Sequence, residues 1–347
     1  MQSNKRHRLS RFASSALVAL ATAAALTAAV ALASCERIFE DLDPCPHGVS
    51  LRFVYDYNME FANAFPAQVD CLTLLIYDDE DNYVDTKTVT GAELQDEDYR
   101  MKLDLEEGEY HFVAYGGMAC RESSFGFGNI PAEGSRKQEL TVEMNDECLV
   151  QPVGKPLHDL FWGELTLATA DLYSEGTVKM MKDTNGIRIV LQQADGGTVN
   201  ADDFDFEITD DNTLFDHTND LVANGTATYT PWAQGQAQTG VSIVGQSQVE
   251  PIPVEVAYAE LSTSRLMTKN APRLTVKRHA DGNTVIDLPL NKYLLLMKSD
   301  RYHKMADQEY LDRESRWTLF FFLQGGTWLN TRIVVNDWVV RINDIEM

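Results

Sequence analysis

Apolar and polar residues alternate along most of this chain, and this period-two pattern most limits its possible folds. In "VSLRFVYDY" (49–57), five apolar side chains fall on one face. The segments "QELTVEM" (138–144) and "FDFEITD" (204–210) repeat the pattern, with short polar turns between such segments. Many short strands and few helices are typical of a β-sandwich rather than of an α/β enzyme core. An all-β fold is therefore predicted.

Glycine-containing turns divide the pattern further. The segment "YRMKLDLEEGEYHFVAYGG" (99–117) predicts a β-hairpin with its turn at Glu106-Glu107-Gly108. Asn185-Gly186 and Asp281-Gly282-Asn283 predict two more tight turns, because Asn and Gly tolerate positive φ. Helical character is predicted for two segments of the second half, "NKYLLLMK" (291–298) and "ADQEYLDRES" (306–315).

The linker "VQPVGKP" (150–156) and the cysteine distribution both point to a boundary near residue 150. Four of the five cysteines lie between residues 45 and 148, and none follows. We therefore expect two sandwiches in tandem, at residues 47–150 and 156–347.

The first 34 residues read as a lipoprotein signal peptide. A basic head precedes an uncharged, alanine-rich run at residues 16–33, which is the layout of a secretory signal. A retained membrane helix is the alternative, but the run is short and weakly apolar for a span. Leu32-Ala33-Ser34-Cys35 resembles a lipobox. Cys35 is then the first mature residue, and its acyl chains hold the protein in a membrane.

Residues 35–46 form an acidic tether between the lipid and the first sandwich. Glu36, Glu40, Asp41 and Asp43 suit a solvated linker. They equally resemble the acidic export tag of some Gram-negative lipoproteins, which sends them to the outer face of the outer membrane. Either way these residues are a tether; we expect the mature protein at the cell outer membrane, and the export tag would expose it at the cell surface.

The charge of the chain excludes one class of partner. Its formal net charge is −24 at pH 7. Such a surface repels the phosphates of nucleic acids, so nucleic-acid binding is not expected.

The cysteines that remain after Cys35 predict disulfides, because an even number in an oxidising compartment favours them. Buried free thiols are the alternative. Cys71 stands at the start of one predicted strand and Cys120 just past the end of another, and antiparallel neighbours bring such positions together. Cys45 and Cys148 would pair only by elimination.

No motif for catalysis, a cofactor or a metal stands out. The sequence lacks HExxH, GxSxG, a phosphate-binding glycine loop and CxxC. His111 reads as an ordinary strand residue. The acidic turn at Asp78–Asn82 suits a solvated hairpin, with calcium as the alternative, although it lacks the central glycine of an EF-hand. The chain is therefore not expected to be an enzyme, and no cofactor is predicted.

Several segments together resemble the FimB-type fimbrial anchor or accessory subunits of type V pili. These are the acylated cysteine with "EDLDPCPHGVSLRFVYDYNMEFANAFPAQVDCLTLLIYD", then "LEEGEYHFVAYGG", "LHDLFWGEL", "QEYLDRES" and "VVNDW". The resemblance covers essentially the whole mature chain. It implies two transthyretin-like β-sandwiches on a lipid tether and contacts with fimbrial shaft or accessory subunits through strand addition.

The same resemblance bears on the N-terminus. Shaft subunits of such pili lose an N-terminal strand to a protease, whereas anchor subunits keep theirs. Arg52 is the only basic residue in the corresponding segment, and it lies mid-strand, where a folded backbone resists cleavage. An uncut N-terminus, and hence an anchor, is favoured.

A surface glycan-binding lipoprotein is the alternative function. Tryptophan rings can stack on sugar rings, and the chain has five tryptophans. Trp317, Trp328 and Trp338 lie in apolar strands and are expected in the core. Trp232, in a Thr-, Gly- and Gln-rich stretch, is the one expected to be exposed.

Overall fold

The structure is a computed structural model that describes residues 48–150, 154–169, 173–241, 252–325, 327–335 and 338–341. Strands arranged in four sheets make up nearly all of its regular structure, so the predicted all-β class is confirmed. The predicted signal peptide and tether lie outside the described residues. In the described ranges, no helix is long and apolar enough to cross a membrane.

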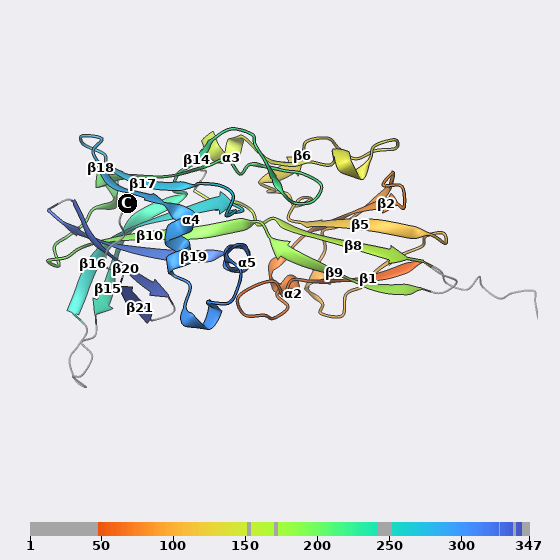
Figure 1. The fold of residues 1–347 in the computed structure, drawn as a ribbon, viewed down its shortest axis with the longest axis horizontal. Coiled ribbons are helices and arrows are strands. Elements are labelled where there is room, and N and C mark those ends of the chain that lie inside the picture. The colour runs from red at the N-terminus through yellow and green to blue at the C-terminus, as the bar shows by residue number, and fades with distance from the viewer. Residues whose placement is uncertain are drawn as a thin grey trace, which may run out of the picture. The chain divides into compact units, whose positions relative to one another are not determined.

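The first sheet has seven strands in the order β3-β2-β5-β8-β9-β1-β4 (Figure 1). Its neighbouring strands are antiparallel except for β1 and β9, which run parallel over six residue pairs. The strands are β1 (Val49–Val54), β2 (Leu72–Asp78), β3 (Tyr83–Val89), β4 (Met101–Leu103), β5 (Glu109–Gly116), β8 (Phe161–Ala168) and β9 (Ser174–Lys182).

Strand β2 is buried on both faces, which explains why its sequence "LTLLIYD" does not alternate. Leu74 and Ile76 belong to a core that also contains Leu51 and Phe53 of β1, so the sheet folds over on itself. The opposite face of β2 belongs to a second, larger core.

Two further sheets face each other across that larger core. The second sheet has the order β15-β16-β10-β19-β20-β21, and the third has the order β14-β11-β17-β18. Ile189 and Leu319 of the second sheet share the core with Phe206 and Val276 of the third. The strands are β10 (Thr184–Gln193), β11 (Phe204–Asp210), β14 (Ala227–Tyr229), β15 (Ala233–Val241), β16 (Ile252–Ser264), β17 (Arg273–Arg278), β18 (Thr284–Pro289), β19 (Arg316–Gln324), β20 (Thr327–Val335) and β21 (Trp338–Arg341).

A small fourth sheet joins early and late parts of the chain. Its strands are β13 (Leu221–Val222), β12 (Leu214–Phe215), β7 (Val142–Met144) and β6 (Phe125–Phe127), in that order. Val142 and Phe215 pair across it and lie in the same core as Tyr115 of β5. The first sheet therefore shares a continuous apolar core with the second and third.

The helices are short and serve mainly to close the cores. α4 (Leu290–Leu296) and α5 (Asp307–Arg313) fall where the sequence predicted helical segments, and both bury most of their large apolar residues, although Leu296 is exposed. The remaining helical turns are α2 (Phe65–Gln68), α3 (Glu147–Val150), η1 (Ala92–Gln95), η2 (Lys137–Glu139), η3 (Ala201–Asp203) and η4 (Asp300–Tyr302).

Two predicted turns differ from the structure. Asn185 and Gly186 lie inside β10, because that strand is hydrogen-bonded to β16 on one side and β19 on the other. The segment 99–117 does not form a hairpin, since β4 pairs with β1 while β5 lies between β2 and β8. The turn at Asp281-Gly282-Asn283 is present, and Gly282 has φ +69° there.

The predicted boundary near residue 150 does not coincide with the division between the sheets. β8 and β9 follow that boundary in sequence, yet they pair with β5 and β1 in the first sheet. The chain passes to the second sheet at Asp183, where β9 ends and β10 begins (Figure 1). The apolar faces of β8 and β9 determine that they pair with β5 and β1. Partners so distant in sequence cannot be assigned from the local pattern.

Candidate functional site

The N-terminal strand β1 lies in the interior of the first sheet. It pairs in parallel with β9 and antiparallel with β4, so both of its edges are occupied. Val49, Leu51 and Phe53 are buried. Arg52 lies in the middle of this strand and is only half exposed. A strand with partners on both sides resists proteolysis, because cleavage requires the backbone to leave the sheet.

The outer edges of the sheets differ in how well they are protected. β3 carries Asp85 and Lys87, and the segment 135–137 pairs with the residues just before it. β18 carries Asp287 and ends at Pro289. Charges and proline at an edge are the usual devices against unwanted pairing.

β15 has none of these devices. Its nine residues, AQGQAQTGV, include no charge and no proline, and it is the first strand of the second sheet. Among the described residues, β16 is the strand that pairs with it. Side chains of Gln234 and Gln236 reach Asp202 and Val199 near η3, which leaves the later part of the strand uncovered by these contacts. β15 is therefore a long, uncharged edge that suits strand addition.

A cleft of about 1060 Å³ opens beside the start of the second sheet. Its lining includes outward-facing residues of the paired strands β10, β16 and β19, such as Arg188, Glu260 and Thr318. The loop between β5 and β6 and the segment before β8 supply further lining residues, among them Arg121, Glu122, Lys155 and His158. Trp232, directly before β15, also lines the cleft and is half-buried.

Some of the charged side chains in the cleft form ion pairs with each other. Arg188 contacts Glu260 at 2.5 Å, and Lys182 contacts Asp159 at 2.7 Å. In the part of the chain that the structure describes, the guanidinium groups of Arg121 and Arg316 make no ion pair.

A buried carboxylate lies where the chain passes between the first two sheets. The Asp183 side chain is fully buried, and its Oδ1 accepts a hydrogen bond from Asn219 at 3.0 Å. Arg265 lies 3.9 Å away but is bound in bidentate fashion to Asp312, at 2.8 Å for each contact. Asp183 Oδ2 is buried and has no hydrogen-bond partner within the described ranges. Burial raises the pKa of Asp183 to about 7, and Arg265 and Asn219 oppose that rise.

Cys71 and Cys120 form a disulfide with their Cα atoms 5.5 Å apart, the pairing that the strand order favoured. Cys148 is a free thiol, and Cys45 lies outside the described residues. The less favoured second bridge is therefore absent from the described part of the chain. The predicted lipidation residue, Cys35, also lies outside it.

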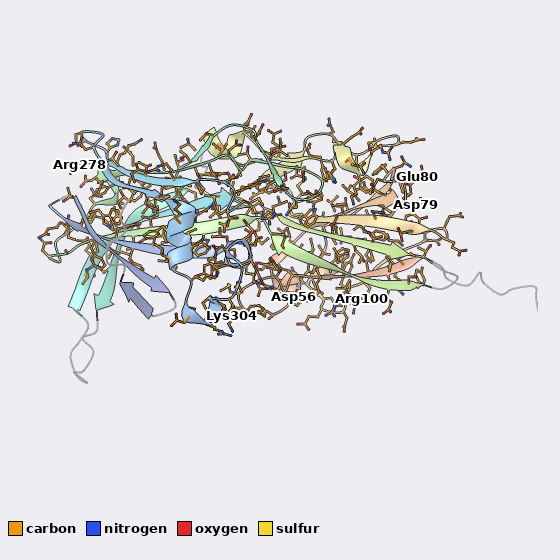
Figure 2. The ribbon with its side chains drawn as sticks, viewed as in Figure 1. Asp56, Asp79, Glu80, Arg100, Arg278 and Lys304 are labelled. Atoms are coloured by element: carbon orange, nitrogen blue, oxygen red, sulfur yellow. A yellow bond between two sulfur atoms is a disulfide. The ribbon has the colours of Figure 1, made fainter. Side chains whose placement is uncertain are left out.

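The other candidate site residues from the sequence take part in ordinary structural contacts. Asp78 accepts hydrogen bonds from the backbone of Glu80 and Asn82, as in an ordinary hairpin turn, and Figure 2 places Glu80 and Asp79 there. On β5, the Nδ1 atom of His111 lies 3.4 Å from Oδ1 of Asp81. Asp70, Cys120 and His158 lie close together, but the Cys120 sulfur is bonded to Cys71 and cannot serve as a thiolate ligand.

The tryptophans follow the expectation in part, since Trp232, which was expected to be exposed, is half-buried. Trp317 is buried, and Trp328 packs half-buried against the core. Trp338 lies in β21, and its side chain is outside the described part of the structure. Arg316 and Asp183 carry no signal in the sequence, because charged residues are abundant and burial leaves no local trace.

Comparisons with known proteins identify the family of the chain. The family model of the Fimbrillin-A associated anchor proteins Mfa1 and Mfa2 matches residues 42–344. No relative was found among curated proteins.

Solved structures are similar over most of the chain. A candidate adhesin from Bacteroides thetaiotaomicron is 61% identical, with a TM-score of 0.81, over 87% of this chain and 100% of that one. A candidate polysaccharide-binding protein from the same species is 30% identical, with a TM-score of 0.72, over 86% and 99%.

The fimbrial anchor protein Mfa2 from Porphyromonas gingivalis shares the fold. It is 13% identical, with a TM-score of 0.59, over 86% of this chain and 99% of that one. The family model confirms the resemblance seen in the sequence, and the family associates this protein with cell-surface fimbriae and their subunits. The chain belongs to the Mfa2 family of fimbrial anchor proteins.

Proposed function

We propose that this protein is a lipid-anchored structural subunit that holds or caps a fimbria at the outer membrane, with the lipid on Cys35. Membership of the anchor family supports the association with fimbriae. The lipobox at residues 32–35 and the acidic tether that follows supply the attachment. Catalysis has no part in this role.

The position of β1 is the observation that carries the proposal. A subunit that polymerises through a vacant strand position must expose an open core and unpaired backbone groups. Here β1 fills the position between β9 and β4 with the protein's own chain. The first sheet is thus complete without a strand from a neighbour, as a subunit that ends or anchors a polymer requires.

The edge of β15 is the proposed contact with the neighbouring fimbrial subunit. It offers nine uncharged residues at the margin of the second sheet. A partner strand would gain backbone hydrogen bonds there without burying a charge. The exposed side chains of Ala237 and Gln238 would lie beside that strand.

Replacing Cys35 with Ala tests the anchor. We expect the variant to leave the membrane fraction and the fimbriae to appear in the medium, while Cys148→Ala, which removes the free thiol, keeps both on the cell. If Cys35→Ala stays membrane-bound through residues 16–33, or if fimbriae remain attached to the cells, the anchoring role is wrong.

Charges placed on β15 test the contact. The double variant Ala237→Lys and Gln238→Lys should reduce recovery of fimbrial subunits in pull-downs, because a charged edge disfavours pairing. Thr284→Lys on β18, the edge of the third sheet, is the matched control and should have no effect. Equal recovery with both variants would assign the contact to another surface.

A further inference from the structure

Where the second sheet forms its wall, the cleft can recognise a ligand only through side chains. Its strands β10, β16 and β19 are paired with each other, so their backbone groups are already used in the sheet. An added peptide strand would therefore find no unpaired backbone N–H and C=O groups on these strands. The cleft instead presents Arg188, Glu260, Ser262 and Thr318, which are polar groups suited to hydroxyl and carboxylate recognition.

The charge of the cleft is opposite in sign to that of the molecule. Five Lys and Arg residues line it against four Asp and Glu residues, whereas the whole chain has 29 against 53. A local excess of positive charge in a protein of net charge −24 attracts anions to this surface in preference to others.

Two of these cations are available for a ligand. Arg188, Lys182 and Lys155 are held by Glu260, Asp159 and Glu122, respectively. Arg121 and Arg316 are exposed and, among the described residues, make no direct ion pair, although Glu122 and Glu314 lie near enough to interact with them electrostatically. A free guanidinium binds a carboxylate through two parallel hydrogen bonds, which are stronger than bonds between neutral groups.

Trp232 adds an aromatic surface next to these charges. Its backbone N donates to the Glu260 carbonyl at 2.9 Å, which fixes the residue at the edge of the cleft. Trp232 is half-buried and is among the residues that line the cleft. An indole that is neither in the core nor fully exposed can stack on the apolar face of a sugar ring.

We propose that this cleft binds an acidic oligosaccharide, whose carboxylates pair with Arg316 and Arg121 and one of whose rings stacks on Trp232. The four acidic residues in the lining disfavour a densely charged polyanion such as a nucleic acid. Carboxylates spaced along a sugar chain match separate guanidinium groups better. The inference does not depend on the role in the fimbria.

Calorimetric titration of the purified full-length chain in detergent tests this site. The probes are hexagalacturonate, a hyaluronan hexasaccharide and sialyllactose, with neutral maltohexaose for comparison. We expect at least one acidic probe to bind more tightly than maltohexaose, and its affinity to fall as NaCl is raised.

Single substitutions locate the binding. Arg316→Gln and Trp232→Ala should each weaken binding of the acidic probe by about tenfold, in line with the loss of one charge-assisted contact or one stacked ring. Arg100→Gln, an exposed arginine outside the cleft that is labelled in Figure 2, should leave the affinity unchanged.

Three results would overturn the proposal. These are the absence of binding to all three acidic probes, equal affinity for maltohexaose, and equal affinity of the Arg316→Gln and Trp232→Ala variants with the unsubstituted protein. A denaturation curve for each variant shows whether it is folded. Because Arg316 and Trp232 lie at the surface of the cleft, one folded variant suffices for a decision.

Discussion

The guanidinium carbon of Arg313 lies 4.1 Å from the centre of the Tyr57 ring. The same group lies 4.7 Å from the ring of Phe61, so the arginine at the end of α5 contacts two aromatic rings of the segment that follows β1. Phe61 is 52% exposed and has φ +56°, an uncommon conformation for a bulky residue. The Asn58 carbonyl accepts a hydrogen bond from the Phe61 backbone at 3.2 Å, which helps hold that conformation.

Replacing Arg313 with Ala should lower the free energy of unfolding by about 2 kcal/mol, because it removes two cation–π contacts and the hydrogen bonds made by the guanidinium. Arg313→Lys should recover only part of the loss, since an ammonium cannot stack as a plane. Urea denaturation measures both. Arg301→Ala is the control, because Arg301 contacts one ring, that of Tyr302. Equal losses at the two positions would mean that the contacts to Tyr57 and Phe61 add nothing.

The buried Asp183 predicts a pH dependence of stability. Its pKa is raised from 3.8 to about 7 in the folded protein, chiefly by burial. The folded state therefore binds a proton more tightly than the unfolded state does, and the contribution of this group falls as pH rises from about 4 to about 7. In Asp183→Asn, which cannot ionise, that fall should be absent.

The measurement is the free energy of unfolding of both proteins at several pH values between 4 and 8. Other carboxylates titrate in the same range, so the difference between the two proteins is the informative quantity. It should shift in favour of Asp183→Asn as pH rises. A difference that stays constant with pH would show that Asp183 keeps its charge throughout, with Arg265 as its partner.

Local pattern predicted which segments are strands, and long-range pairing decided where they lie. Alternation in 49–57 and 204–210 correctly indicated β1 and β11. It could not indicate that β1 pairs with β9, because a partner distant in sequence leaves no local trace. Asn185-Gly186 is a strong turn signal in isolation, but two neighbouring strands hold it extended in β10.

The candidate site was predictable only in part. Trp232 was singled out because its polar surroundings suggested exposure, and it lines the cleft. Arg316 and Arg121 carried no such signal, since nothing in the sequence shows which of 29 Lys and Arg residues lack a partner. Their role depends on strands and loops that the fold brings together.

The disulfide between Cys71 and Cys120 should contribute about 4 kcal/mol to stability, because it closes a loop with a sequence separation of 49. We expect the double variant Cys71→Ala and Cys120→Ala to unfold at a correspondingly lower urea concentration. Adding dithiothreitol should destabilise the original protein but not the variant. A protein whose two cysteines react with an alkylating agent before any reductant is added would contradict the pairing.

Alanine substitutions at Gly117 and Gly134 distinguish the free-energy cost of a strained backbone conformation from that of a steric clash. Both have φ +88°, so alanine is strained at either position. A Cβ at Gly117 would collide with the Asp159 carbonyl, whereas a Cβ at Gly134 meets no atom within 4 Å. Gly134→Ala should cost about 1 kcal/mol from backbone strain alone, and Gly117→Ala about 3 kcal/mol or more, because backbone atoms must move. Urea denaturation of the two variants measures the difference. Equal costs would mean that the loop containing Asp159 can move to accommodate the Cβ. The wall of the cleft formed by this loop would then be flexible rather than rigid.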